Sequence, residues 1–173
     1  MKKKIILSLL GFAVLLYSLS LYTGITTLVI PLSGYKAREH PAIKKGERVN
    51  PLQRLDFEKG KWVAYLVIAP ADRGDLNPAF RKASCYRSDD AGLFNRMKKK
   101  WDFTYTAGDA ATVSSVIYFL RDGKIEFVSG IVLDKNREGL QDNEYGWLEP
   151  VEQHVLSDHL RQFKRVYWPV LIF

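Results

Sequence analysis

VSSVIYFLRDGKIEFVSGIVL, residues 113–133, is the clearest secondary-structure signal in this 173-residue chain. Two runs rich in β-branched and aromatic residues flank an Asp122-Gly123 pair. Aspartate and glycine accept the positive φ angles of a tight hairpin turn at low cost. The pattern therefore predicts two antiparallel strands, residues 113–120 and 124–133. Gly130 inside the second run indicates a bulge or a close approach of another backbone segment.

More strands are expected on both sides of this hairpin. Residues 62–69 (WVAYLVIA) form a continuous apolar run between a glycine and a proline, which is typical of a buried strand. Residues 101–107 (WDFTYTA) alternate aromatic and polar side chains, and this pattern predicts a half-buried strand over 102–107. The last residues, 166–173 (VYWPVLIF), are also typical of a strand, and Pro169 places it at a sheet edge or a bulge.

Helices are expected between and after these strands. Asn77-Pro78 is a typical helix start, because a capping side chain is followed by proline. Ser88-Asp89-Asp90 can cap a second helix at 91–99, and residues 151–163 carry apolar side chains at helical spacing. Residues 134–150, by contrast, are expected to form a long polar loop with an aromatic tip. Together these segments predict an α+β domain with a mainly antiparallel sheet packed by helices.

A charge-free run at the N-terminus, residues 5–35, follows three lysines. A helix rises about 1.5 Å per residue, so a bilayer core about 30 Å thick needs about 20 apolar residues. Residues 5–23 meet that length, and the lysines favour a cytoplasmic N-terminus by the positive-inside tendency. A cleaved signal peptide is the alternative, with Ser18-Leu19-Ser20 as the nearest small-x-small triplet. A buried helix of a soluble protein is the third interpretation.

The run predicts a single-pass protein of the inner (cytoplasmic) membrane of the bacterial envelope, in contact with the membrane through residues 5–32. Residues 1–35 are then a cytoplasmic lysine stub and a transmembrane signal-anchor, and 36–52 are a tether. Residues 53–173 form one extracytoplasmic, periplasmic domain of ordinary size.

Charge and cysteine content limit the partners. Three of the seven net positive charges lie in Lys2–Lys4 and residues 1–35 hold no acid, which leaves +4 for residues 36–173. A domain this mildly basic does not call for nucleic acid, whereas it would attract anionic lipid headgroups or an acidic protein. Cys85 is the single cysteine, so the domain relies on its core and not on disulfides, and the thiol is expected to be a small buried residue.

Two features suggest a protein-binding surface. Tyr145 and Trp147 lie on either side of a glycine, and exposed aromatic residues often dominate the energetics of interfaces. The most basic patch outside the N-terminus consists of Arg96, Lys98, Lys99 and Lys100. These six residues are the predicted binding site, with another envelope protein as the partner. Two alternatives stay open: Trp147 folds back onto the core, and the lysines only complement a helix dipole.

These observations predict a membrane-anchored, extracytoplasmic protein-binding module, such as an immunity protein or an accessory subunit of an envelope complex. The chain contains no G-x-S-x-G, P-loop, H-E-x-x-H or zinc-type cysteine pair, so no cofactor, metal or enzymatic activity is expected. The alternative is an envelope hydrolase that uses Asp72, Asp75, Glu144 and Glu149. Glycoside hydrolysis would need two carboxylates about 5–10 Å apart across a cleft.

Two segments resemble parts of thioredoxin-like proteins. Residues 61–75 (KWVAYLVIAPADRGD) are similar to the first buried strand and active turn of that family, with Asp72 and Asp75 at the two cysteine positions. Residues 118–130 (YFLRDGKIEFVSG) are similar to the strand–turn–strand after the family's cis-proline, which is missing in this chain. The resemblance implies a binding scaffold without thiol chemistry.

Overall fold

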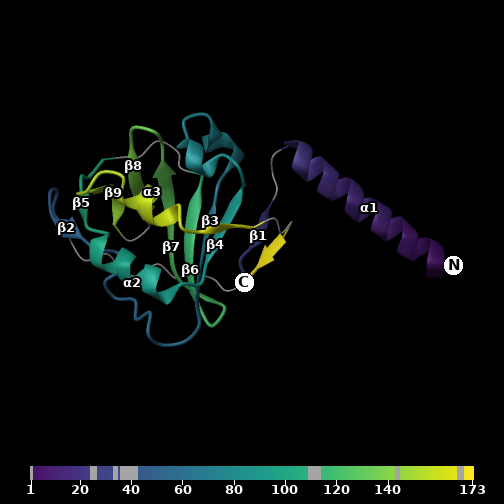
Figure 1. The fold of residues 1–173 in the computed structure, drawn as a ribbon, viewed down its shortest axis with the longest axis horizontal. Coiled ribbons are helices and arrows are strands. Elements are labelled where there is room, and N and C mark those ends of the chain that lie inside the picture. The colour runs from purple at the N-terminus through teal and green to yellow at the C-terminus, as the bar shows by residue number, and fades with distance from the viewer. Residues whose placement is uncertain are drawn as a thin grey trace.

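The computed structural model describes residues 2–23, 27–32, 35, 43–108, 114–142, 145–166 and 170–173. Among these residues nine strands form one sheet in the order β10-β4-β3-β6-β7-β8-β9-β5-β2 (Figure 1). Every neighbouring pair in this sheet is antiparallel. The strands are β2 (Arg48–Val49), β3 (Trp62–Val67), β4 (Cys85–Ser88), β5 (Phe103–Tyr105), β6 (Val116–Arg121), β7 (Lys124–Leu133), β8 (Glu138–Asp142), β9 (Gly146–Pro150) and β10 (Lys164–Arg165).

The hairpin predicted from the Asp-Gly pair is confirmed as β6 and β7. Asp122 and Gly123 both have positive φ angles, 51° and 80°, as a tight hairpin turn requires. The register of the two strands shifts between Phe119 and Leu120, and not at Gly130, for which the sequence predicts either a bulge or a close approach of another backbone segment. Gly130 instead pairs on both sides, because β7 runs between β6 and β8.

Two helices, α2 (Ala91–Lys100) and α3 (Val155–Leu160), pack against the sheet (Figure 1). α2 begins as predicted, because the Asp90 carboxylate accepts a hydrogen bond of 3.0 Å from the Leu93 backbone N–H. Leu93, Phe94 and Met97 form its buried face. The Phe94 ring lies edge-on to Phe119 of β6, with 5.5 Å between ring centroids. The predicted fold class, α+β with a mainly antiparallel sheet, is confirmed.

The segment 134–150 is not the predicted loop, because it supplies β8 and β9. Leu140 and Leu148 pair directly across these strands, and both side chains are fully buried. Few of the other residues are apolar, so hydrophobic alternation was too weak to reveal the strands. α3 is also shorter than predicted, since His154 has a φ of 63° and the helix begins only after it. β4 was not predicted, and two short 3₁₀ helices, η1 (Pro70–Arg73) and η2 (Pro78–Phe80), precede it.

A separate two-stranded sheet joins the ends of the domain. β1 (Leu28–Ile30) pairs in parallel with β11 (Val170–Ile172). Leu171 and partly buried Val29 pack in one small cluster with Cys85. The predicted C-terminal strand is therefore present, but it pairs with the N-terminal segment, while Pro169 lies outside the described residues.

The prediction of a membrane anchor is wrong. Within the part of the chain that the structure describes, no helix combines the length and the apolar character needed to cross a membrane. The first turn of α1 (Lys2–Thr23) begins with three lysines. Residues 28–30, which belong to the predicted membrane contact at 5–32, form strand β1 instead. The signal-anchor, the single-pass topology and the inner-membrane and periplasmic localisation are wrong with it. Figure 1 shows α1 extending away from the domain.

Two further sequence-based predictions can be compared with the structure: the tether at 36–52 and the resemblance to thioredoxin-like proteins. The tether at 36–52 is described only at residues 43–52, where β2 joins the sheet and Leu52 is fully buried. β3 pairs antiparallel with both β4 and β6. A thioredoxin-like core contains a βαβ unit, whose strands are parallel. The resemblance therefore does not extend to the fold.

Candidate binding site

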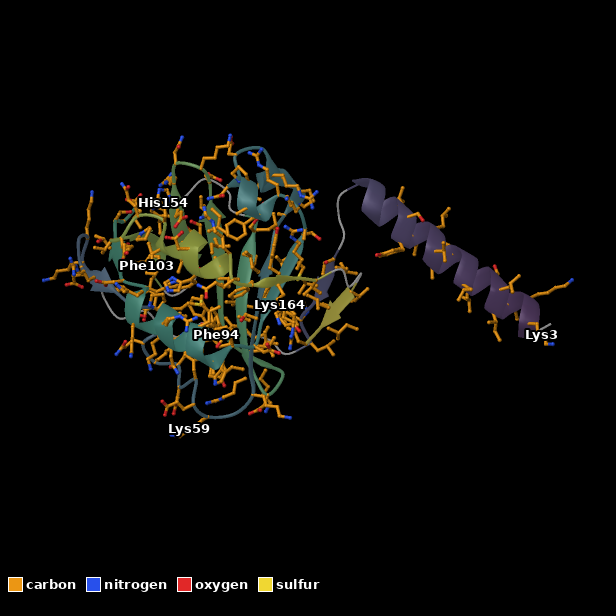
Figure 2. All side chains as sticks on the ribbon, viewed as in Figure 1. Lys3, Lys59, Phe94, Phe103, His154 and Lys164 are labelled. Atoms are coloured by element: carbon orange, nitrogen blue, oxygen red, sulfur yellow. The ribbon has the colours of Figure 1, made fainter. Side chains whose placement is uncertain are left out.

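An open cleft of about 420 Å³ lies where the start of β8 and the end of β9 meet the segment before α3. We call it the Arg137 cleft. Figure 2 shows His154 on that segment. The lining residues are polar or charged except for one proline: Lys135, Asn136, Arg137, Glu138, Glu149, Pro150, Gln153 and His154.

Glu138 lines the Arg137 cleft with a buried side chain. Its side chain is only 3% exposed, and its carboxylate accepts hydrogen bonds from the backbone N–H groups of Leu156 (3.0 Å) and Ser157 (3.3 Å) at the start of α3. Nδ1 of His154 lies 3.8 Å from the same carboxylate. A buried carboxylate needs such partners because desolvation of an unpaired charge is costly. Glu138 therefore fixes where α3 and His154 stand.

Arg137, Trp147 and Glu149 form a second unit of the cleft. The Arg137 guanidinium lies 4.6 Å from the centre of the Trp147 ring and 3.2 Å from the Glu149 carboxylate. The indole N–H of Trp147 donates to the same Glu149 oxygen at 2.9 Å. Close packing against Gly139 fixes the indole, because a Cβ atom at that position would overlap its ring. The face of the Arg137 guanidinium thus rests on the Trp147 ring, and one of its N–H groups donates to Glu149.

A second hollow, of about 280 Å³, lies between α2 and α3. Its lining consists of Arg96, Lys99, Lys100, Glu152, Val155, Asp158 and His159, and we call it the α2–α3 groove. Three of the four predicted basic residues therefore line one hollow. The fourth, Lys98, points elsewhere and donates a hydrogen bond of 2.7 Å to the Leu55 carbonyl oxygen.

The predicted aromatic anchor does not lie on the surface as expected. Trp147 is 1% exposed, so it cannot insert into a partner, and the alternative that it folds back onto the core is confirmed. Tyr145 is half-buried and packs against the main core. The indole instead contacts two residues of the Arg137 cleft, because Arg137 stacks on its ring and Glu149 accepts its N–H. The predicted role of Trp147 as an exposed anchor is therefore wrong.

The acids of the predicted hydrolase are not gathered around one cleft. Oδ2 of Asp72 accepts hydrogen bonds from both the N–H and the hydroxyl of Ser115, at 2.7 and 2.6 Å. Asp72 and Asp75 do not line the Arg137 cleft, which Glu149 lines, and Glu144 lies outside the described residues. Burial, then the charges of Asp75 and Asp72, raise the pKa of Asp134, and Arg137 opposes that rise.

The thiol of the single cysteine lies in the interior of the domain. Cys85 is fully buried, and burial raises the pKa of its thiol to about 12. In the described ranges, no group of three or more histidine, cysteine or acidic residues could hold a metal ion.

Sequence analysis missed Arg137 and Glu138 because the segment around them was assigned as a loop, and it missed His154 because that residue was placed inside the helix predicted over 151–163. A signal was present: the Tyr145-Gly146 turn lies between Leu140 and Leu148, which is typical of a hairpin. That hairpin would bring Arg137 and Glu149 together. The contact of Glu138 with α3 has no local signal.

The fold and the site define an α+β domain with an antiparallel sheet and an open charged cleft at one end of β8 and β9. Comparison with family models, curated proteins and solved structures finds no match for this chain.

Proposed function

We propose that this chain is a non-enzymatic protein-binding module whose α2–α3 groove takes an acidic segment of a partner protein. The observation that carries the proposal is the composition of the groove. Arg96, Lys99 and Lys100 stand along α2, and Val155 contributes an apolar surface on α3. The lining holds three basic side chains against two acidic ones, Glu152 and Asp158. A groove between helices with an apolar floor and an excess of basic side chains suits an amphipathic segment that carries acids.

The basic side chains of the groove are available for a partner. Lys99 is exposed and makes no ion pair with any described side chain. Lys100 lies 3.7 Å from Glu152 and Arg96 lies 4.0 Å from Asp90, and all four of these side chains are more than half exposed. Exposed pairs of this kind are worth at most about 1 kcal/mol, so a partner's carboxylates can replace them.

The placement of the acids favours binding over hydrolysis. Asp72 is engaged by Ser115, and Glu149 by Arg137 and Trp147. A retaining or inverting glycosidase needs two carboxylates that face each other across the substrate. Neither Asp72 nor Asp75 faces Glu149 across the Arg137 cleft.

The test uses the full-length chain and a labelled peptide with leucines on one helical face and glutamates on the other. Fluorescence anisotropy is expected to show binding that weakens as salt rises. The double variant Lys99→Glu, Lys100→Glu is expected to weaken binding at least about tenfold, because two attractive charges become repulsive. Lys124→Glu, in the exposed β6–β7 turn, is the matched control for charge reversal. An affinity that ignores the double reversal, or falls equally in the control, contradicts the proposal.

A further inference from the structure

We propose that the Arg137 cleft is a binding site for a small carboxylate ligand, and that Glu149 weakens this binding as an internal competitor. The site is separate from the α2–α3 groove and does not depend on the function proposed for it. Its volume of about 420 Å³ falls in the range of small-molecule sites, about 300–1,000 Å³, and exceeds what a lone carboxylate group would fill. The ligand therefore carries its carboxylate on a body about the size of a dipeptide.

Both acids of the lining are already occupied. The Glu138 carboxylate is buried and accepts from the N–H groups of Leu156 and Ser157. One Glu149 oxygen accepts from both Arg137 and Trp147. The groups that remain open to a ligand are therefore mainly donors, and an anionic group with acceptor oxygens complements them.

The donors come from four side chains of the lining: Lys135, Asn136, Gln153 and the N–H groups of Arg137 that do not contact Glu149. The first three side chains contact no polar partner among the described residues, and all of them line the cleft. Arg137 has five N–H donors, and within the described part of the chain its side chain donates to Glu149 alone. His154 adds an imidazole ring, and its side chain is 56% exposed.

Arg137 is preorganised for this task. Its guanidinium is stacked on Trp147 and tied along one edge to Glu149, so little side-chain entropy remains to be lost on binding. The internal contact also indicates the ligand chemistry, because the unit already holds one planar carboxylate, that of Glu149. A carboxylate matches the planar fork of arginine, and it is the group that Arg137 already holds.

Glu149 has the opposite effect on an incoming ligand. Its carboxylate is 46% exposed and neutralises part of the Arg137 charge. The Trp147 indole keeps Glu149 in place, so the ligand must bind beside this negative charge. Glu149→Gln keeps an acceptor oxygen for the indole but removes the charge. It should therefore tighten binding, which a purely structural role of Glu149 would not do.

The experiment is an NMR titration of the full-length chain with N-acetyl-alanyl-alanine, which ends in a free carboxylate. The indole N–H resonance of Trp147 is the reporter, because that group donates to Glu149. The resonance is expected to shift saturably with the acid and not with the same peptide as its C-terminal amide. Arg137→Gln should weaken binding at least about tenfold, and Glu149→Gln should tighten it about threefold.

The β6–β7 hairpin provides a matched control, because Arg121 there lies 5.7 Å from the Trp62 ring centre and pairs with Glu126. Arg121→Gln and Glu126→Gln should leave the affinity unchanged. Equal shifts with acid and amide, no shift up to about 50 mM acid, or weaker binding by Glu149→Gln would overturn the proposal. A shift with inorganic phosphate but not with the acid would overturn the carboxylate assignment as well. Each variant's amide spectrum verifies that it is folded.

Discussion

The Asp134 carboxyl lies at the end of β7, where burial and the charges of Asp75 and Asp72 raise its pKa. The folded state therefore binds a proton at Asp134 more readily than the unfolded chain does. The contribution of Asp134 to the unfolding free energy is fully present below its pKa in the unfolded chain. This contribution is lost as the pH rises through its pKa in the folded state. At neutral pH the ionised Asp134 thus destabilises the fold.

Asp134→Asn is expected to raise the melting temperature at pH 7, and the gain should disappear near pH 3, where Asp134 of the parent chain is neutral too.

Asp56→Asn is expected to lower the melting temperature at pH 7, and this loss should shrink as the pH falls toward 3. The Asp56 carboxylate accepts hydrogen bonds from the Lys59 ammonium and from the Glu58 backbone N–H, and both lower its pKa. Its stabilisation is therefore present above the unfolded pKa and is lost as pH falls through the folded pKa. Thermal melts at both pH values check the two signs, and equal changes at pH 3 and pH 7 would rule out the electrostatic explanation.

Gly139 is a residue whose missing side chain matters. A Cβ atom there would lie 2.9 Å from the Leu148 carbonyl oxygen and would overlap the Trp147 ring. Gly139→Ala should cost about 1–3 kcal/mol of unfolding free energy, because overpacking forces the indole or the strand to move. Urea denaturation gives the cost, with Gly74→Ala as the control, since nothing lies within 4 Å of a Cβ at that glycine. A similar cost in both variants would contradict the overlap.

At the scale of elements, α3 is a six-residue helix that lacks a cap of its own. Its N-cap residue, His154, makes no capping hydrogen bond through its side chain. Glu138, the first residue of β8, supplies the missing acceptors instead. A helix this short would be unstable alone, because helix nucleation is costly, so a strand residue decides where α3 begins.

Glu138→Gln should destabilise the protein by about 1–3 kcal/mol, because buried hydrogen bonds to a charged acceptor are replaced by neutral ones and an amide N–H₂ must be accommodated. Hydrogen exchange should quicken most at Leu156 and Ser157. Glu152→Gln is the control, since its side chain is 64% exposed and, among the residues that the structure describes, its ion pair is with Lys100. Unchanged protection of the α3 amides in Glu138→Gln would show that the cap is unimportant.

The contrast between α2 and α3 shows what the sequence could predict. Asp90 caps α2 from the adjacent position, and Asp122-Gly123 closes β6–β7 locally, so both were predictable from neighbouring residues. The cap of α3 comes from a residue sixteen positions before His154, and no local pattern encodes it. β8 and β9 were missed because most of their side chains are polar. Leu140, Trp147 and Leu148 are large apolar residues of these strands that are deeply buried, and β8 also holds the buried carboxylate of Glu138.

At the scale of the molecule, the same limit applies to the sheet and the site. The strand runs at 62–69 and 113–133 were visible, but nothing local places β3 between β4 and β6. The basic side of α2 was predicted, whereas its facing wall comes from α3, far along the chain. The predicted aromatic tip failed because β9 turns Trp147 toward the interior.

The two ends of the domain are joined by β1 and β11, and this contact makes the C-terminus part of the fold. Leu171 is 3% exposed and packs with Cys85, whereas its neighbour Ile172 is 60% exposed. The buried thiol, whose pKa burial raises to about 12, reports on whether the two strands stay closed. A thiol with so high a pKa holds almost no thiolate at pH 8, and thiolate is the reactive form.

Leu171→Ala should therefore lower the unfolding free energy by about 2 kcal/mol, near the low end for buried leucine because the cluster is small. Ile172→Ala should change it by less than about 0.5 kcal/mol. A thiol-reactive dye at pH 8 should leave Cys85 unlabelled in the parent chain and in Ile172→Ala, and label it faster in Leu171→Ala. Equal labelling in both variants, despite their unequal stability, would mean that the β1–β11 contact does not control access to the Cys85 thiol.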